Sequence, residues 1–416
     1  MTKSARTGAG PVDDTELFDE FAAVDGVIGD VRDPFPEYAQ RRATTPVHLS
    51  NPAMNGQAGD GADDAPVFQL YRFDDCDRAL REAETFSSGG YAGVMGVVMG
   101  HTILEMDGAE HLTHRLLVAQ AFRPKVLREW EADVIVPVVT ELVDAFVDRG
   151  RAELVAEFTA RFPILVIASM LGLPREDHRQ FLAWSLDLIS VGRDWDRGVK
   201  AAGELHEYFG AIVAERRADP RNDLISQLVE AELDDRRLVD DEIIPFLNLL
   251  LPAGAETTYR STGNLLFGLL TDPSMLEEVR DNRRLVTPAI EEALRWEPPL
   301  HTIIRQATRD VELSGVTIPA GSSVVVNLGA ANRDPERWKD PDTFDIHRAP
   351  IPHLAFASGP HACLGMHLAR AEMRVALVTL LDRLPNLRLD PADGEDPHIH
   401  GLIFRSPTSL PVAFDA

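Results

Sequence analysis

The sequence predicts a mainly α-helical protein with small β-sheets, built as a single large domain. Apolar residues recur at three- and four-residue spacing across residues 74–282, for example at Ile135, Val138 and Leu142, which is typical of helices with one buried face. After Arg309 the pattern changes to short β-branched runs separated by turn residues. A length of 416 residues usually indicates two or three domains, but no linker-like stretch divides this chain.

Four segments define the expected organisation more closely. Extended stretches at 47–49 and 67–71 flank the small, polar residues 51–64, which predicts a hairpin with a long loop. Residues 87–106 are rich in glycine, valine and methionine without a clear period, so we expect a mobile apolar loop there. The longest helical pattern covers 240–270, roughly 46 Å of helix, and a last helix is expected over about 364–384.

Composition excludes several functional classes. Two cysteines are too few for a disulfide framework, a four-cysteine zinc site or a cysteine-ligated iron–sulfur cluster. A net charge of -26 repels nucleic acid and anionic membranes. The N-terminal residues show no signal-peptide pattern, and no apolar run reaches the eighteen or so residues of a spanning helix, so we expect a cytoplasmic protein that binds neither membrane nor nucleic acid.

Cys363 stands where a loop containing glycine and proline runs into the predicted last helix. A thiolate at a helix N-terminus faces unpaired N–H groups, which lower the pKa of the thiol and favour an anion. Such a thiolate is a suitable iron ligand. The alternative is a buried structural cysteine that follows a turn.

The long central helix contains a polar interruption at residues 253–258, Ala-Gly-Ala-Glu-Thr-Thr. A buried acid beside an alcohol suits proton delivery during oxygen reduction, with Glu256 leading to solvent and Thr257 as the hydroxyl. Pro252 and Gly254 should weaken the helix locally and open a groove. Alternatively, Thr257 bonds a carbonyl one turn earlier and Glu256 pairs with Arg260.

The cysteine loop resembles the F-x-x-G-x-H-x-C-x-G signature of the cytochrome P450 family. All five fixed positions match, and Ala357 stands where the family often has glycine, which affects only the local turn. Residues 253–258 resemble the family's A/G-G-x-D/E-T-T/S oxygen-binding motif. The matching residues of the signature are Phe356, Gly359, His361, Cys363 and Gly365.

The resemblance begins at about Pro34, which implies an N-terminal extension over 1–33 and a heme-thiolate monooxygenase domain over 34–416. It also implies the cytochrome P450 fold, with heme b held between the long central helix and the cysteine-loop helix, and Cys363 as the iron ligand. Glu256 and Thr257 then take the catalytic acid and alcohol roles.

Charged residues at matching positions are assigned to two groups by the resemblance. Glu292, Arg295 and Arg348 look like the family triad that supports the cysteine loop from behind. The heme propionates require cations or N–H donors, and the cofactor contacts implied by the resemblance are His111, Arg115, Arg305 and His361. His353 and His114 are expected to be a turn residue and a solvent-facing histidine, respectively.

Substrate contacts are expected in apolar stretches that the resemblance places around the heme. They suit a terpenoid, steroid, fatty acid or polyketide, with His301 and Thr302 as a possible polar anchor. Some of these residues could simply fill the core. The candidates are Val97, Leu250, Ala253, Ile303 and Phe404.

The implied reaction is hydroxylation or epoxidation of an apolar small molecule with dioxygen and two electrons. No segment for a bound flavin or an iron–sulfur cluster is expected in this chain, so a ferredoxin and a ferredoxin reductase are the implied electron donors. Two alternatives are a hydrogen-peroxide-dependent peroxygenase and a heme-binding partner protein without catalytic activity.

Overall fold

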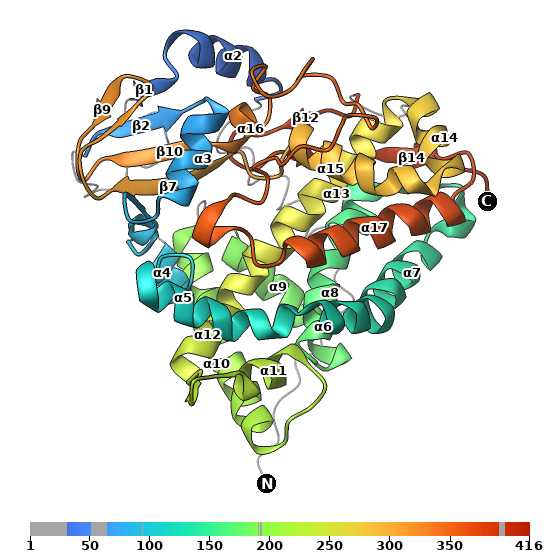
Figure 1. The fold of residues 1–416 in the computed structure, drawn as a ribbon. Helices are drawn as coiled ribbons and strands as arrows, with labels where there is room; N and C mark the ends of the chain where they lie inside the picture. The colour runs from blue at the N-terminus through green and yellow to red at the C-terminus, as the bar shows by residue number, and fades with distance from the viewer. Residues whose placement is uncertain (1–30, 51–64, 94, 190, 192–193, 391–395) are drawn as a thin grey trace.

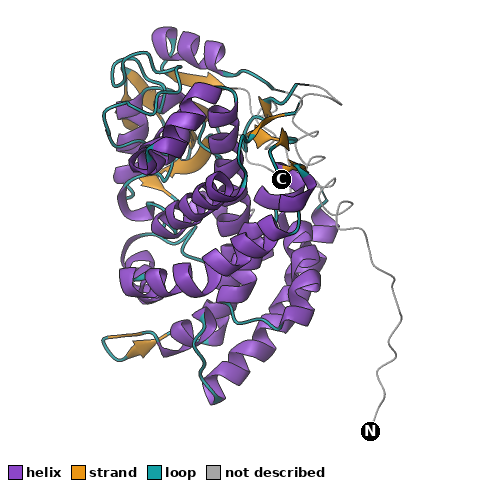
Figure 2. Cartoon of the chain, turned by 90° about the vertical axis from the view of Figure 1, so that its right-hand side faces the viewer, coloured by secondary structure: helices purple, strands orange, loops and turns teal. Residues whose placement is uncertain are grey.

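The computed structural model describes residues 31–50, 65–93, 95–189, 191, 194–390 and 396–416. Helices form most of this part of the chain, and the larger sheet lies along one side of them, at the upper left of Figure 1. In the view turned by 90°, most strands lie at the upper end of the helical body, and a short hairpin projects at its lower end (Figure 2). The predicted fold class is therefore confirmed.

The helices follow the apolar periodicity of the sequence. Their bounds are α2 Phe35–Thr44, α3 Phe73–Arg81, α4 Met95–Met99, α5 Gly108–Val118, α6 Pro124–Trp130, α7 Val136–Asp144, α8 Phe162–Met170, α9 His178–Ile189, α10 Trp195–Ala218, α11 Leu224–Glu230, α12 Asp240–Leu251, α13 Thr257–Leu270, α14 Pro273–Asp281, α15 Val286–Trp296, α16 Leu328–Ala331 and α17 Met366–Arg383.

The largest sheet combines strands from both ends of the chain in the order β1-β2-β10-β7-β3. Strand β2 pairs antiparallel with β1 and parallel with β10, and β10 pairs antiparallel with β7. The strands of this sheet are β1 Val47–Ser50, β2 Val67–Leu70, β3 Phe86–Ser87, β7 Thr302–Ala307 and β10 Ser323–Asn327.

Four smaller sheets complete the strand content of the described residues. Strands β11, β14 and β4 form a three-stranded sheet, and β5–β6, β8–β9 and β12–β13 are two-stranded. The bounds are β4 Arg151–Glu153, β5 Glu232–Leu233, β6 Arg236–Arg237, β8 Val311–Leu313, β9 Val316–Ile318, β11 Arg388–Leu389, β12 Ile399–His400, β13 Ser406–Pro407 and β14 Pro411–Ala413.

Two large apolar clusters form most of the core, beside a small third cluster around Tyr38. The larger one lies among the helices and includes Phe158, Phe162 and Phe209, while the other packs the large sheet against α3 and includes Leu70 and Val324. Burying side chains of this size is the main favourable contribution to folding. The helical half and the sheet half therefore each have their own buried layer.

The predicted long central helix consists of α12 and α13 joined by a π-helical turn over Pro252–Glu256. Proline has no N–H to donate to the carbonyl four residues earlier, and a widened turn is one way for a helix to continue past that missing bond. A Cβ on Gly254 would lie 3.0 Å from Cδ1 of Ile167, so glycine lets α8 pack closely here. The predicted departure from a regular helix at Pro252 and Gly254 is confirmed, while the groove expected there stays a prediction.

Two segments near the N-terminal end, 87–106 and 51–64, were predicted to be loops. The expectation of an irregular loop over 87–106 is wrong in part, because its described residues include a 3₁₀ turn at Gly89–Tyr91 and helix α4. Val98 and Met99 of α4 are buried in the main core, which explains why a glycine-rich segment becomes helical. The predicted hairpin loop at 51–64 lies outside the described residues, although the strands on either side pair as expected.

Within the described part of the chain, none of the helices combines the length and the apolar character needed to cross a bilayer.

Candidate active site

The cysteine loop is held by backbone hydrogen bonds and by one glycine that cannot be replaced without strain. The Cys363 N–H donates to the Phe356 carbonyl at 2.9 Å. Gly359 has a φ of +72°, and a Cβ there would lie 2.5 Å from the backbone oxygen of Leu80. Ala357 also has a positive φ, +56°, which is costly for a residue with a side chain. The loop therefore keeps its turn although alanine replaces the usual glycine.

The surroundings of Cys363 differ from the predicted helix N-terminus. Helix α17 begins at Met366, so the thiol lies before its first turn. Although Cys363 reaches the accessible surface, the surrounding protein raises the pKa of its thiol above the usual value, while the Gly365 N–H and the charges of Arg115 and Arg370 oppose that rise. The predicted lowering of this pKa is wrong. A coordinated metal ion deprotonates a thiol by itself, so a ligand role does not depend on the helix dipole.

Two histidines lie beside the loop with nitrogen atoms that have no partner among the described residues. The rings of His111 and His361 are stacked with centroids 4.0 Å apart, and the Nε2 atom of each is buried without a hydrogen bond. Nε2 of His361 lies 3.4 Å from an oxygen of Asp107, too poorly aligned to count as a hydrogen bond. Unsatisfied buried nitrogens are rare in native proteins and fit a ligand with acceptor oxygens.

Two arginines are placed around the same histidine pair. Arg115 donates to the carbonyl of Ala362, next to Cys363, at 2.5 Å. Arg305 is 4% exposed, and its charge acts on both His111 and His361. Burial lowers the pKa of both arginines and of His111, and it lowers that of His361 to about 4. Two arginines beside histidine N–H donors suit carboxylates such as the two propionates of heme.

Thr257 and Glu256 in the central helix make the local contacts that were considered as the alternative to a role in proton delivery. The Thr257 hydroxyl donates to the Ala253 carbonyl at 2.7 Å. Glu256 is 4% exposed and accepts from Arg260 at 3.2 Å, so the expected route from this acid to solvent is not present. Ala253, by contrast, is exposed although Leu251 and Ala255 beside it are buried. The helix therefore keeps an accessible side at the π turn.

The predicted triad is confirmed. Glu292 accepts from Arg295 at 2.7 and 2.8 Å and from Arg348 at 3.0 Å. Arg295 also donates to the carbonyls of Pro341 and Thr343. These bonds fix the irregular segment that leads from α16 towards the cysteine loop, and they satisfy a carboxylate that is itself buried.

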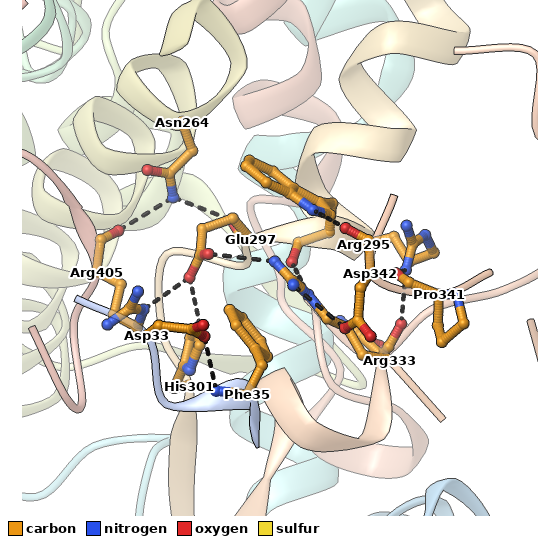
Figure 3. Close-up of polar contacts among 12 residues, drawn as sticks. Asp33, Phe35, Asn264, Arg295, Glu297, His301, Arg333, Pro341, Asp342 and Arg405 are labelled. Carbon is orange, nitrogen blue, oxygen red and sulfur yellow. Dashed lines mark hydrogen bonds and ion pairs between the residues drawn. The ribbon is translucent and has the colours of Figure 1, made fainter. Parts of the chain in front are cut away.

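A second buried ionic cluster was not predicted, and Figure 3 shows it. Glu297 accepts from His301 at 2.8 Å and from Arg405 at 2.7 Å, and its other oxygen lies 3.4 Å from Arg333. Burial alone would raise the pKa of Glu297, but the charge of Arg405 and the His301 contact lower it to about 2. Asn264 of α13 donates to the backbone carbonyls of Glu297 and Arg405, so the cluster ties the central helix to the C-terminal segment.

Two histidine expectations are corrected by these contacts. His301 is 0% exposed and bonded to Glu297, which rules it out as a substrate anchor in this arrangement. His114 is buried rather than solvent-facing, because it bonds Glu242 at 2.8 Å across to α12. His353 was expected in a turn but lies just before the turn at Ala355 and Phe356, with its Nε2 3.3 Å from Glu291.

The candidate substrate residues lie on five separate parts of the fold, with Leu250 in the last turn of α12. Val97 is 63% exposed on α4, and Ala253 lies in the π turn. Ile303 lies in β7, and Phe404 forms an isolated bridge with Leu300. A surface pocket of about 430 Å³ lies elsewhere. Its lining includes His101, Glu110, His114, Arg236 and Glu242, but neither Cys363 nor the central motif.

Comparison with known proteins relates these features to one family. A family model described as "Cytochrome P450" matches residues 164–409. The chain is 35% identical to a putative cytochrome P450, YjiB, of Bacillus subtilis (strain 168), over 86% of this chain and 89% of the relative. It is 37% identical to the mycinamicin IV hydroxylase/epoxidase of Micromonospora griseorubida, over 75% and 79%, respectively.

Solved structures agree with the sequence relatives. The crystal structure of CYP109E1 from Bacillus megaterium in complex with testosterone has a TM-score of 0.83 and 32% identity, and the match covers 92% of this chain and 100% of that one. CYP109Q5 from Chondromyces apiculatus has a TM-score of 0.84 and 35% identity, with coverage of 92% and 96%.

Proposed function

Because the chain belongs to the cytochrome P450 family and is a heme-thiolate monooxygenase that uses heme b, we propose that Cys363 is its iron ligand. The proposal is supported by the place of Cys363 in a loop held at Gly359 and Phe356. The Gly365 N–H directed at the sulfur is the kind of hydrogen bond that tunes a thiolate ligand. The monooxygenase domain is proposed to span 34–416, with 1–33 as an extension.

The observation that carries the cofactor site is the pair of stacked histidines with unpartnered Nε2 atoms. His111, His361, Arg115 and Arg305 are proposed to hold the two propionates, because each has an N–H group that can donate to a carboxylate. Asp107, 3.4 Å from Nε2 of His361, is an acid beside this group. When bound, the heme supplies the activation of dioxygen for insertion of one oxygen atom into the substrate.

Thr257 and Glu256 are proposed to deliver protons for this chemistry. The Thr257 hydroxyl lies on the accessible side of the π turn and can orient a water or an oxygen atom there. Glu256 is buried and accepts a hydrogen bond from Arg260. Its carboxyl group therefore has to leave Arg260 before it can pass a proton towards Thr257. In this arrangement Glu256 is bonded to Arg260 and shielded from solvent.

The substrate is proposed to be an apolar molecule of the steroid, terpenoid, fatty acid or polyketide class. Val97, Leu250, Ala253, Ile303 and Phe404 would line its site, and their side chains offer surface for apolar contact with few polar groups. Named relatives include enzymes described as hydroxylases or epoxidases, and a solved relative holds testosterone. These names give no support to a peroxygenase or to a non-catalytic heme-binding protein.

Electrons are proposed to come from a ferredoxin and its reductase. Helix α5 reaches the cysteine loop through Arg115, and on the same helix Leu112 and Leu116 are 57% and 46% exposed. Arg123 and Arg128 are exposed a short distance along the chain. Exposed apolar side chains on α5 and the exposed arginines that follow it along the chain are proposed to form a surface for an acidic partner despite the net charge of -26. A reducing cytoplasm, where a free thiol such as Cys76 is stable, is the proposed location.

The reduced carbon monoxide difference spectrum of the purified protein tests the central proposal. Thiolate ligation moves the Soret band far to the red of histidine-ligated heme, and we expect the red-shifted band in the natural protein and in Cys76→Ser. Cys363→His should lose this band and abolish monooxygenase turnover, since histidine donates less electron density for O–O cleavage. A red-shifted band or normal hydroxylation rate in Cys363→His would rule out the assignment of the ligand.

A further inference from the structure

Arg260 is a buried cation on the same helix as the proposed proton donor, one turn further along. It is 0% exposed, and its Nη2 lies 3.2 Å from Oε1 of Glu256. A guanidinium removed from water has to be compensated by hydrogen bonds and charge. The contact with Glu256 thus stabilises both groups and fixes where the carboxylate lies.

The other side of Arg260 contacts the C-terminal turn formed by residues 401–406. Nη1 donates to the Ser406 hydroxyl at 3.1 Å, and the guanidinium carbon lies 5.5 Å from the centroid of the Phe404 ring and 5.0 Å from that of Tyr259. An arginine between aromatic rings gains cation–π stabilisation in addition to its hydrogen bonds. The guanidinium is therefore positioned by the turn as well as by its own helix.

The turn itself is attached to the central helix and reaches the proposed substrate site. Asn264 of α13 donates to the Arg405 carbonyl at 3.0 Å, and Pro407 lies 3.5 Å from the place of a Cβ on Gly263. Phe404 bridges to Leu300, immediately before strand β7. The turn that carries a candidate substrate contact thus also supports the guanidinium that holds Glu256.

We propose that Arg260 is a positioning residue that holds the Glu256 carboxylate in place from the C-terminal turn, so that displacement of Phe404 changes how this acid is held. The inference rests on the proposed role of Glu256 in proton delivery. It adds a physical link between the substrate side of the protein and the acid that serves the oxygen site. A second buried carboxyl group, that of Glu372 on the neighbouring helix α17, contacts α13 at Thr258.

The first experiment measures the protonation of Glu256 directly, by infrared difference spectroscopy on the heme-loaded full-length protein. In Arg260→Gln we expect a new carboxylic-acid C=O band, since a buried carboxylate that loses its cation takes up a proton, and we expect the band to be absent from Glu256→Gln/Arg260→Gln. Arg260→Lys keeps the charge and should resemble the natural protein. The exposed pair of Arg283 with Asp382 provides the control Arg283→Gln, which should show no band.

The second experiment measures oxygen reduction without added substrate, using NADPH with a plant-type ferredoxin and its reductase as surrogate donors. We expect the ratio of water to hydrogen peroxide to fall by roughly tenfold in Arg260→Gln, less than the loss expected when a whole general acid is removed. Arg260→Lys should restore most of the ratio. A purely structural role would lower thermal stability and leave this ratio unchanged.

The outcomes separate the two proposals. If Arg260→Gln shows neither the infrared band nor the altered ratio, the positioning role is wrong. If Glu256→Gln itself leaves the ratio unchanged, the proton role of Glu256 fails, while the infrared result still decides whether Arg260 holds it. Phe404→Leu tests the link to the turn: a partial infrared band supports it, and a spectrum identical to that of the natural protein refutes it.

Discussion

A buried carboxyl group on α17 gives a stability prediction that can be worked out in detail. Glu372 is 2% exposed, and no ion pair to it is found among the residues that the structure describes. Burial raises the pKa of Glu372 to about 8, although a hydrogen bond from the Thr258 side chain opposes that rise. The group is therefore expected to be mostly protonated at pH 7 in the folded protein and ionised in the unfolded chain.

The size of the effect follows from the difference between the two states. One pKa unit corresponds to about 1.4 kcal/mol, so a rise from 4.5 to about 8 corresponds to about 5 kcal/mol over the full titration. Because the folded protein holds the proton more tightly, this stabilisation is complete below about pH 4.5 and is lost as the pH rises through about 8. About 4 kcal/mol of it should disappear between about pH 5 and pH 9.

Glu372→Gln removes the titration while keeping the size of the side chain and a hydrogen-bonding group for Thr258. Urea unfolding of the heme-loaded protein, followed by circular dichroism across this pH range, should give a free energy of unfolding that falls less steeply for the variant. Glu129→Gln, at a side chain 50% exposed, is the control and should follow the natural protein. Parallel curves for Glu372→Gln and the natural protein would refute the reasoning.

Three further predictions concern the buried framework and the cofactor site. Glu297→Ala should lower the free energy of unfolding by about 3–5 kcal/mol, because Arg405 loses its buried counter-ion. Chemical denaturation measures this free energy, and a change below about 1 kcal/mol would contradict the prediction. Gly359→Ala should lower stability by about 2 kcal/mol or more, since it combines a positive φ with a clash at the Leu80 oxygen, and an unchanged melting temperature would be inconsistent with the loop geometry. His361→Leu should speed heme transfer to apomyoglobin by roughly 10- to 100-fold, the loss of one charge-assisted hydrogen bond, whereas an unchanged rate would exclude a propionate contact.

Much of the fold could be predicted because apolar periodicity is a local signal. The pattern at 240–270 identified the central helix, and Pro252 with Gly254 identified the place where it deviates. Among the site residues, the loop around Cys363 and the i, i+4 pair His111 and Arg115 were found from short motifs. The structure brings His111 and His361 into contact, which their separation in the sequence does not show.

The remaining features depend on contacts between distant segments. In the sequence, nothing distinguishes Glu297 from other acidic residues near helix ends. Its partners Arg333 and Arg405 are distant along the chain and come next to it only in the folded protein. His114 was expected on the surface because its partner, Glu242, lies far along the chain. The short helix α4 was missed because burial of Val98 and Met99 in the core outweighs the low helix propensity of a glycine-rich segment.

The π turn at Pro252–Glu256 also determines how changes in chain length would act on this protein. A π turn contains one residue more than an α-helix needs for the same path, and one residue corresponds to about 100° of rotation around a helix axis. Deleting one residue from this turn would restore a regular helix and leave α12 and α13 in their present rotation relative to one another. Deleting one residue from the start of α13, between Thr257 and Arg260, would instead turn Arg260 by about 100° and take it away from the C-terminal turn. The contact of Arg260 with that turn therefore depends on the number of residues in α13 rather than in the π turn.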